Sequence, residues 1–329
     1  MGASAAALHG SPIPDGALAS VKRTGVALKG PLASTSGSVH GPINIALRNK
    51  LDLFAQVRPV RSWSGLRGPK IDLVVARELT EDFAAGLDFD RGTDQCEAIL
   101  ECVASISGRH LDRSTALTLR PVSESATRKF MEFMFSWAEM HGRSRVTVAH
   151  KATVLRATDG LFLEVSRDVA AGHHRVEMDE RLVDTLCADL VRDPSCFDVV
   201  IAPFLYGDII SDITAVLGGG LGLAPGANYG ADIAVFEATH GTFPKRAGTD
   251  EANPLAMVLT GAMMLHHLGE HEAADRVTSA VAAVLSTGDA LTYDLHPDRP
   301  TTVIGTSALA DRILDEMVRN GDRTDPASA

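Results

Sequence analysis

The chain has few of the features that mark exported, membrane-bound or nucleic-acid-binding proteins. Its four cysteines among 329 residues form neither a C-x-x-C pair nor a disulfide framework, which predicts a reducing compartment, the cytoplasm. No apolar run approaches the length of a membrane span, and residues 1–20 lack the basic start and apolar block of a signal peptide. We therefore expect no membrane partner and no export.

Basic charge is also scarce. The formal net charge is −11 at pH 7, whereas a general nucleic-acid surface needs a basic stripe, so no nucleic-acid partner is expected. The chain contains neither a G-x-G-x-x-G turn between a strand and a helix nor a Walker P-loop, which argues against a standard Rossmann dinucleotide site. A local group of arginines would still allow the chain to bind an anionic small molecule.

Short apolar runs alternate along the chain with longer amphipathic segments. Strands are expected at 24–30, 70–78, 145–151 and 197–204, and helices at 17–23, 42–54, 123–142, 178–193, 254–267 and 272–285. This alternation predicts an α/β fold with a substantially parallel sheet. Residues 86–119 fit neither pattern, and we expect an arm or a small sheet used for subunit contact.

Two carboxylates form the first candidate site. Asp208 and Asp212 stand four residues apart in GDIISD, which places both on one face of a helical turn. Like charges in that position repel unless a cation lies between them. Oxygen ligands favour Mg²⁺ or Mn²⁺ over zinc. The alternative is a solvated helix face.

Basic side chains offer a complementary set of candidates. Arg48, Arg58 and Arg77 lie close together in the sequence, and guanidinium forks bind carboxylates in bidentate fashion, so the three suit a di- or tricarboxylate. Three surface ion pairs are the alternative. Lys151 ends an apolar strand and is a candidate for proton transfer, or is simply solvated there. Asp184, in a helical pattern, is either a buried metal ligand or an exposed residue.

The loop 240–253 is a candidate for holding a dinucleotide without a Rossmann turn. It offers backbone donors, two adjacent cations (Lys245 and Arg246) and the amide of Asn253, which could meet an adenine edge.

Together these segments resemble the isocitrate/isopropylmalate dehydrogenase family of β-decarboxylating dehydrogenases, from about residue 16 to 314. The matching stretches are KGPLAS (29–34), NIALR with LDLFAQVRPVR (44–61), ARELTED (76–82), VAHK (148–151), LYGDIISD (205–212), GGLGLAPGAN (219–228) and FEATHGTFPKRAG (236–248). The resemblance implies two α/β domains, a central mixed sheet with flanking helices and a non-Rossmann cofactor site. The large cofactor-binding domain would combine 1–53 with 218–329, and the small domain would be 54–217 with a dimerisation arm at about 87–119.

The resemblance also implies roles for the matching residues. The substrate carboxylates would be clamped by Asn44, Arg48, Arg58 and Arg77. Asp208 and Asp212 would hold Mg²⁺ or Mn²⁺ together with Asp184 contributed by the partner subunit, and Lys151, also contributed by the partner, would help to remove the hydroxyl proton. Sites shared in this way imply a homodimer. The cofactor would be held by Ser34, Glu237, His240, Gly241, Thr242, Lys245, Arg246, Asn253 and Tyr293.

Cofactor choice follows from charge. NAD-using relatives place an acidic and an apolar residue where this chain has Lys245 and Arg246, which are two donors for a 2′-phosphate. Tyr293 matches a tyrosine of NADP-using members, although Pro297 stands where an arginine is expected after it. Arg299 and His296 are the candidates to compensate for that arginine. NADP is expected, with NAD as the alternative.

Several positions depart from the family pattern. The helix GPINIALR resembles that of isocitrate enzymes, but Pro42 replaces a serine that meets the distal carboxylate, and Ala84 replaces the catalytic tyrosine. Asparagines are usual at three further positions, which here are Leu79, Thr153 and Phe204. The family's opening strand and its G-D-G-I-G-P-E turn have no counterpart.

The resemblance implies metal-dependent oxidative decarboxylation of isocitrate or an isocitrate-like 2-hydroxy-3-carboxy acid with NADP. The departures suggest a non-standard substrate, and a phosphonate analogue, whose extra group would use room opened at Ala84, is one candidate. The alternatives are a catalytically weak or regulatory isocitrate dehydrogenase-like subunit, or a 3-isopropylmalate or D-malate dehydrogenase.

Overall fold

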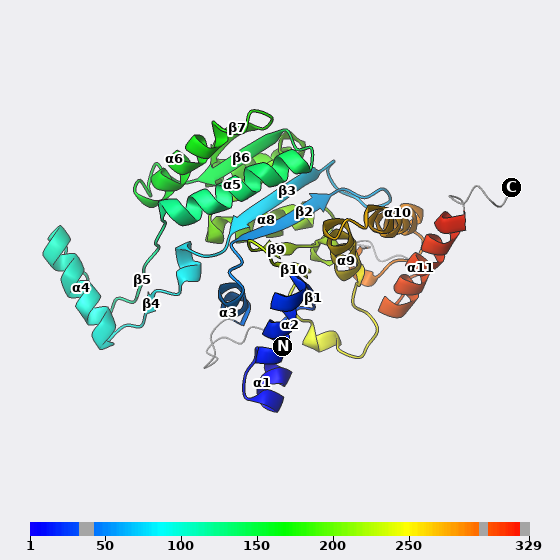
Figure 1. Ribbon diagram of the computed structural model, residues 1–329, viewed down its shortest axis with the longest axis horizontal. Coiled ribbons are helices and arrows are strands. Elements are labelled where there is room, and N and C mark those ends of the chain that lie inside the picture. Colours follow the sequence, from blue (N-terminus) through cyan, green and yellow to red (C-terminus); the bar gives the residue numbers. More distant parts are fainter. Residues whose placement is uncertain (33–42, 296–301, 323–329) are drawn as a thin grey trace.

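A single mixed sheet of eight strands organises the computed structural model, which describes residues 1–32, 43–295 and 302–322 (Figure 1). Across the sheet the strands are β1 (Val26–Lys29), β10 (Ala234–Glu237), β9 (Ala227–Tyr229), β2 (Ala55–Arg61), β3 (Asp72–Glu78), β8 (Val199–Ala202), β6 (Arg145–His150) and β7 (Glu177–Leu182). The helices are α1 (Ala3–His9), α2 (Asp15–Thr24), α3 (Ile43–Lys50), α4 (Asp94–Ser107), α5 (Glu124–Met140), α6 (Thr158–Ala170), α7 (Val183–Arg192), α8 (Phe204–Leu217), α9 (Leu255–His267), α10 (His271–Thr287) and α11 (Thr306–Asp322).

Parallel and antiparallel pairing meet in this sheet. Strands β3, β8, β6 and β7 run parallel to one another, as do β1 and β10, whereas β10, β9, β2 and β3 pair antiparallel. The predicted α/β fold with a central mixed sheet and flanking helices is therefore confirmed. Strand β1 lies at one edge and pairs only with β10 among the described strands.

Residue alternation gives the sheet two different faces. Val57, Val74 and Ala76 join a core cluster beneath α5 and α6, whereas Leu73 and Val75 join a second cluster beneath α7 and α8. Successive side chains of a strand point to opposite faces, so one strand serves both clusters. In Figure 1 helices α5, α9 and α10 lie in front of the sheet and α8 lies behind it.

Two helix boundaries differ from expectation. The segment 178–193 starts as strand β7, which pairs in parallel with β6, and becomes helix α7 at Val183. Its charged, half-exposed residues lack the apolar run that marks a buried strand, because β7 lies at the sheet edge. The helix expected to reach residue 54 ends at Lys50; Asp52 has a left-handed φ of 49°, and the chain turns into β2.

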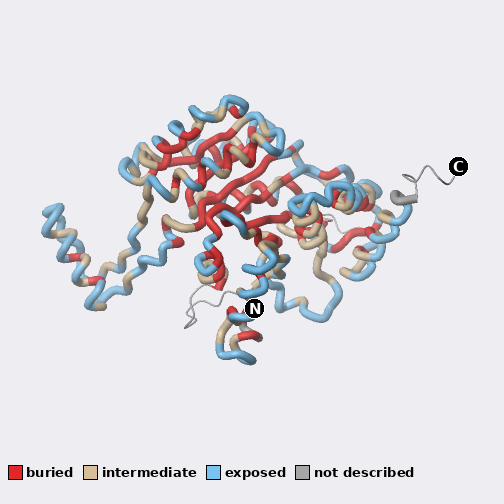
Figure 2. The backbone as a smooth tube through the Cα atoms, in the orientation of Figure 1, coloured by how far each residue is buried: buried red, intermediate tan, exposed pale blue. Residues whose placement is uncertain are grey.

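The segment 86–119 leaves the body of the molecule as an arm. It contains the two-stranded sheet of β4 (Asp88–Phe89) and β5 (Leu117–Thr118), as expected, and also helix α4, whose first turn is capped by Thr93. Figure 2 shows most of the arm exposed, in contrast to the buried strands at the centre. Its use in subunit contact stays a prediction.

The large sheet runs through both predicted domains. Strands β1, β9 and β10 come from 1–53 and 218–329, and the other five come from 54–217. The division at these boundaries stays a prediction. Within the described part of the chain no helix has the length and apolar character required to cross a bilayer.

Candidate active site

Helix α8 presents two carboxylates beside the ends of strands β2 and β3. Asp208 and Asp212 lie one turn apart, and their side chains are 49% and 60% exposed. Gly207 lets the helix approach β3, because a Cβ there would lie 2.8 Å from Cβ of Arg77. The absence of a side chain at 207 therefore helps to place both carboxylates next to the arginines.

Arg58 on β2 and Arg77 on β3 face these carboxylates from inside the protein. Both arginines are buried, at 7% and 4% exposure. Arg77 is hydrogen-bonded to Asp208, while Arg58 lies 3.5 Å from Asp208 and 3.7 Å from Asp212 and donates to Ser211 Oγ. The sequence indicated these four charged residues, but not Ser211.

The charge at this site is only partly compensated. Burial lowers the pKa of Arg77 to about 9; Asp208 opposes the shift, and Arg58 and Arg48 add to it. The Nε atoms of Arg58 and Arg77 are buried and have no hydrogen-bond partner among the described residues. Burial also raises the pKa of Asp212, against the attraction of Arg58, and repulsion from Asp208 adds to the rise. An added anion would compensate the arginines, and an added cation the aspartates.

A second buried network surrounds Glu237 at the end of β10. Lys29, its register partner on β1, forms an ion pair with it, and Arg48 lies 3.3 Å away. Burial opposes ionisation of Glu237, but Lys29 and Arg48 outweigh it and lower the pKa of this carboxyl. Asn228 donates to Glu237 over 2.9 Å and accepts from Arg48 over 3.1 Å. Lys29 and Asn228 lie in stretches of sequence that resemble the family, but the sequence alone indicated no role for either.

The predicted substrate contact Asn44 lies near the start of α3. The side-chain oxygen of Asn44 is buried and has no hydrogen-bond partner among the described residues, so it is available to a bound ligand. Ser34 and Pro42 lie outside the described residues, as do His296, Pro297 and Arg299.

Lys151 and Asp184 form an ion pair with each other in this chain. They are brought together because β6 and β7 end side by side, with His150 in register with Leu182. The hydrogen bond from Lys151 lowers the pKa of the exposed Asp184 carboxyl. Within the described residues no three His, Cys, Asp or Glu side chains converge to hold a metal, so Asp184 does not join Asp208 and Asp212 inside one subunit.

A buried ion cluster joins the root of the arm to the Lys151 loop. Arg120 binds both oxygens of Asp82, at 2.7 and 3.2 Å, and also donates to Asp159, whose other oxygen accepts from the Lys151 backbone N–H over 2.6 Å. Asp82 and Asp159 are 1% and 0% exposed. Burial works to lower the pKa of Arg120, but its bonds to the two carboxylates outweigh it and raise that pKa. No motif in the sequence pointed to this cluster.

The predicted cofactor loop is largely exposed, including Gly241, Thr242 and Lys245, with His240 partly buried. Arg246 is ion-paired with Glu251, and its guanidinium lies 4.6 Å from the ring centre of Tyr293. The structure thus brings the predicted pair Arg246 and Tyr293 together across about fifty residues of sequence.

Asn253 is already engaged in this chain. Its Nδ2 donates to Asp294 over 3.0 Å, and its Oδ1 accepts from the Leu255 backbone N–H over 2.9 Å at the start of α9. An adenine edge would have to displace these hydrogen bonds before it could contact the Asn253 amide. The role of Asn253 in cofactor binding stays a prediction.

Comparison with known proteins decides the family. A sequence model of the isocitrate/isopropylmalate dehydrogenase family matches residues 1–313. The chain belongs to this family. It is 39% identical over 299 residues to the mitochondrial isocitrate dehydrogenase [NAD] catalytic subunit 5 of Arabidopsis thaliana (90% of this chain, 74% of that one). It is 33% identical over 336 residues to the isocitrate dehydrogenase [NADP] of Archaeoglobus fulgidus (94% and 81%).

A solved structure agrees with the sequence relatives. The isocitrate dehydrogenase of Methylococcus capsulatus superimposes with a TM-score of 0.86 at 36% identity and covers 96% of this chain and 88% of its own. The chain is therefore a decarboxylating dehydrogenase of the isocitrate dehydrogenase type. Family members use NAD or NADP with Mg²⁺ or Mn²⁺, and the relatives include both NAD and NADP enzymes, so they do not decide between the two.

Of the positions that depart from the family pattern, Phe204 contacts one of the arginines. Phe204 packs its ring against the guanidinium of Arg77, with the ring centre 3.8 Å away, and Leu79 is 1% exposed. Thr153 is exposed. Ala84 lies on the short helix η1 (Asp82–Ala85) and is 3% exposed. The room expected at this position stays a prediction.

Proposed function

We propose that this chain oxidises and decarboxylates isocitrate, or an isocitrate-like 2-hydroxy-3-carboxy acid, with NADP and a divalent cation. One observation carries the proposal: two buried arginines, whose Nε atoms have no hydrogen-bond partner among the described residues, lie directly against two half-exposed carboxylates. A ligand with several carboxylates and a hydroxyl, bound together with a divalent cation, would satisfy both sets of charge at once.

In this mechanism the arginines orient the substrate. The substrate carboxylates would bind to Arg48, Arg58 and Arg77. The free oxygen of Asn44 would accept a hydrogen bond from the substrate hydroxyl or from a bridging donor. Asp208 and Asp212 supply oxygen ligands that fit Mg²⁺ or Mn²⁺, but they make an incomplete set within one chain. When bound, the cation would act as a Lewis acid on the substrate oxygens.

Proton transfer falls to Lys151. As a neutral amine it would take the proton of the substrate hydroxyl, and a bound nicotinamide cofactor would supply the acceptor for the hydride lost from carbon 2, which leaves the 2-oxo acid. Carbon dioxide then leaves from carbon 3, and that carbon takes up a proton. Since Ala84 carries no acid, the proton would return from Lys151 or from water.

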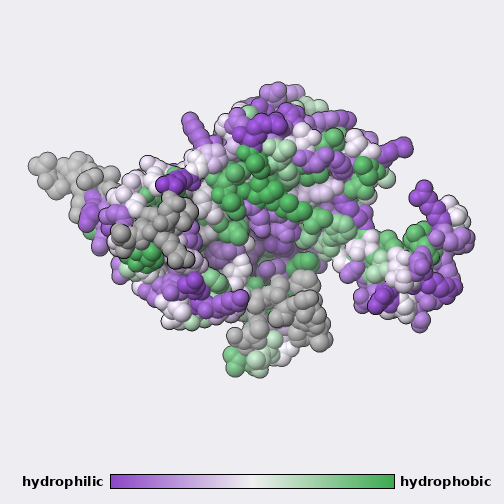
Figure 3. All heavy atoms as spheres, turned by 180° about the vertical axis from the view of Figure 1, so that it is seen from behind, coloured by the Kyte–Doolittle hydropathy of each residue, from purple (hydrophilic) through white to green (hydrophobic). Residues whose placement is uncertain are grey.

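We further propose a homodimer with shared sites. Leu205, Ile209 and Val216 on α8 are 38%, 49% and 66% exposed, beside Asp208 and Asp212. Figure 3, which views the molecule from the side on which α8 lies, shows apolar side chains gathered at the middle of this face. A second copy covering it would bring its own Lys151 and Asp184 toward the incomplete set of carboxylates.

The preference for NADP rests on the two cations of the cofactor loop. Lys245 is exposed and carries no ion pair among the described residues, and Arg246 is braced by Glu251 and Tyr293. A 2′-phosphate would add charge-assisted hydrogen bonds to both. NAD remains the alternative, because several relatives are named isocitrate dehydrogenase [NAD].

Subunit complementation tests the proposed function and its shared site together. Lys151→Met and Asp212→Asn subunits should each be inactive with isocitrate, Mn²⁺ and NADP. In a mixed dimer one site would have all of its groups intact, so unfolding and refolding the two variants together should restore roughly a quarter of the wild-type rate. Wild-type protein is unfolded and refolded in parallel as the control. If it regains activity and the mixture of the two variants does not, the proposed shared site is contradicted.

The second candidate is a catalytically weak or regulatory subunit, favoured by the alanine at position 84. It predicts Mn²⁺ binding by calorimetry but no NADPH from isocitrate, its phosphonate analogue, 3-isopropylmalate or D-malate. NADPH formation from one acid of this panel would reject it. Activity on 3-isopropylmalate or D-malate alone would instead assign the substrate to those alternatives.

A further inference from the structure

A large hollow lies on the opposite face of the sheet from the candidate active site. Its volume is about 840 Å³, within the range of small-molecule sites. One wall comes from β2, β3 and the end of α5, and the other from α9, α10 and the turn after β9. The strand alternation that points Arg58 toward Asp208 points Pro59 and Arg61 into this hollow.

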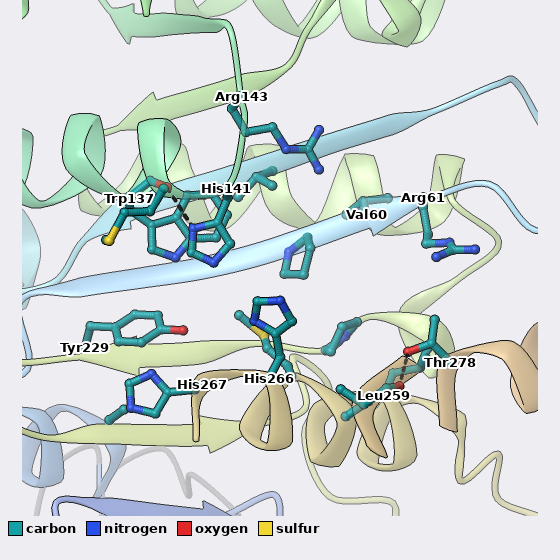
Figure 4. A pocket seen from close by; sticks show the side chains of 18 of the residues that line it. Val60, Arg61, Trp137, His141, Arg143, Tyr229, Leu259, His266, His267 and Thr278 are labelled. Atoms are coloured by element: carbon teal, nitrogen blue, oxygen red, sulfur yellow. Dashed lines mark hydrogen bonds between the residues drawn. The ribbon is translucent and has the colours of Figure 1, made fainter. Parts of the chain in front are cut away.

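Flat rings line the hollow. His141 stacks on Trp137 with ring centres 3.8 Å apart and an angle of 16°, and the ring of His266 lies 5.9 Å from that of His141. Figure 4 shows His141 and His266 reaching toward each other from opposite walls, with Tyr229 and His267 to one side. Such surfaces favour a planar, aromatic ligand.

His141 provides a defined hydrogen-bonding edge. Its Nδ1 lies 2.7 Å from the carbonyl oxygen of Trp137, which can only accept, so Nδ1 carries a proton. Burial lowers the pKa of His141, against that bond, and nearby His266 and Arg143 add to the lowering. In the neutral ring Nε2 is then an acceptor, and a ligand donor would satisfy it.

Arg61 provides the charge. Its guanidinium lies 4.2 Å from the ring centre of Trp63, and among the described residues no carboxylate lies within ion-pair distance of it. The other lining arginine, Arg143, is already held by Asp72 and Asp198. Asp232 and Asp275, also on the lining, are exposed. The available cation therefore calls for an anionic group on the ligand.

We propose that this hollow is a second ligand site, which takes a flat aromatic molecule carrying an anionic group and a hydrogen-bond donor. The ring would lie among Trp137, His141 and His266, and the anion would bind Arg61, which Figure 4 shows at the other end of the view from Trp137. The histidines do not make it a metal site, since no three potential ligands converge in the described part of the chain. The site does not depend on the proposed reaction.

The chain supplies its own reporter for this site. It contains two tryptophans, Trp63 and Trp137, and both line the hollow. The probe is 8-anilinonaphthalene-1-sulfonate, which combines aromatic rings, an N–H donor and a sulfonate. With selective excitation of tryptophan, titration should quench protein emission and raise dye emission by energy transfer, saturating at one dye per chain.

Two variants and a matched control decide where the dye binds. Arg61→Ala should raise the dissociation constant about tenfold or more, because a charge-assisted bond is lost. Thr278→Phe, which adds a ring to the α10 wall, should weaken binding by at least as much. Arg91→Ala, an exposed arginine on the arm, should leave the titration unchanged, and melting curves should show that all three variants fold.

Three results would overturn the proposal. The first is wild-type protein giving no saturable energy transfer, and the second is Arg61→Ala binding the dye as tightly as wild type does. The third is Arg91→Ala weakening binding as much as Arg61→Ala does, which would indicate attraction to basic charge in general. If Thr278→Phe does not fold, Arg61→Ala still decides, because Arg61 is exposed and its loss leaves no cavity.

Discussion

The two faces of the central sheet carry opposite chemistry, although the same strands build both. On β2, Arg58 faces the carboxylates of α8, while its neighbour Pro59 lines a hollow of aromatic rings. The first face is held by ion pairs that burial leaves partly uncompensated, and the second by apolar packing with Trp137 and Tyr229. The difference shows how a two-residue repeat lets one sheet support a reaction site built from ion pairs and a cavity lined by aromatic rings.

The largest expected effect belongs to the charged face. Lys151→Met should lower kcat about 10²–10⁴-fold, because a proton-transfer group is lost, while KM for the acid changes much less. Initial rates of NADPH formation measure this. Lys70→Met, an exposed lysine in the loop before β3, is the matched control and should keep the wild-type rate. Equal rates in both variants would remove Lys151 from the mechanism.

The two faces should also differ in how their stability responds to pH. Glu237→Gln leaves Lys29 and Arg48 without their buried carboxylate and should cost about 3–5 kcal/mol at pH 7. The folded-state pKa of Glu237 is depressed, so its contribution is present above the unfolded value of about 4.3 and is lost as pH falls through the folded pKa. Urea unfolding from neutral pH down to pH 4 and below should show the difference from wild type shrinking.

The apolar face supplies the control for that experiment. Met134→Ala, on the buried face of α5, should cost about 2–5 kcal/mol, and this cost should not depend on pH. If the loss of unfolding free energy in Glu237→Gln also stays constant over this pH range, the ionised carboxylate does not account for that loss.

A smaller effect is expected in the cofactor loop. Removing both cations, Lys245→Ala with Arg246→Ala, should weaken NADP about 10–100-fold and leave NAD nearly unchanged, because the groups that would meet the 2′-phosphate are lost. Steady-state KM values for the two cofactors give the ratio. An equal loss for both would assign the pair to the shared part of the dinucleotide.

The smallest effect concerns charges outside both faces. Arg128 on α5 is 36% exposed at its side chain and pairs with Glu124 and Asp168. Arg128→Ala should leave the midpoint of urea unfolding almost unchanged, since exposed ion pairs are screened by water and salt. A clear loss of stability in urea unfolding would contradict this, because an exposed ion pair would then stabilise the fold as strongly as a buried one.

Prediction from sequence succeeded where chemistry follows local spacing. The spacing of Asp208 and Asp212 placed both on one side of a helix, and α8 carries them so, one turn apart. It failed where neighbours decide: Glu177–Leu182 is a strand because β6 offers an edge to pair with, although its residues alone suit a helix. Nothing local marks Arg120 as the partner of Asp82 and Asp159.

The sequence by itself determined the alternation of strands and helices, the residues that match the family and the paired carboxylates, because these depend on spacing within a few residues. Only the tertiary structure decided that Arg58 and Arg77 are buried against α8 and that a ring-lined hollow lies on the opposite face of the sheet. It also decided that Lys29 and Arg48 compensate the charge of Glu237. Such contacts join segments far apart in the chain. Their energies depend on burial and charge that arise only when the sheet has formed.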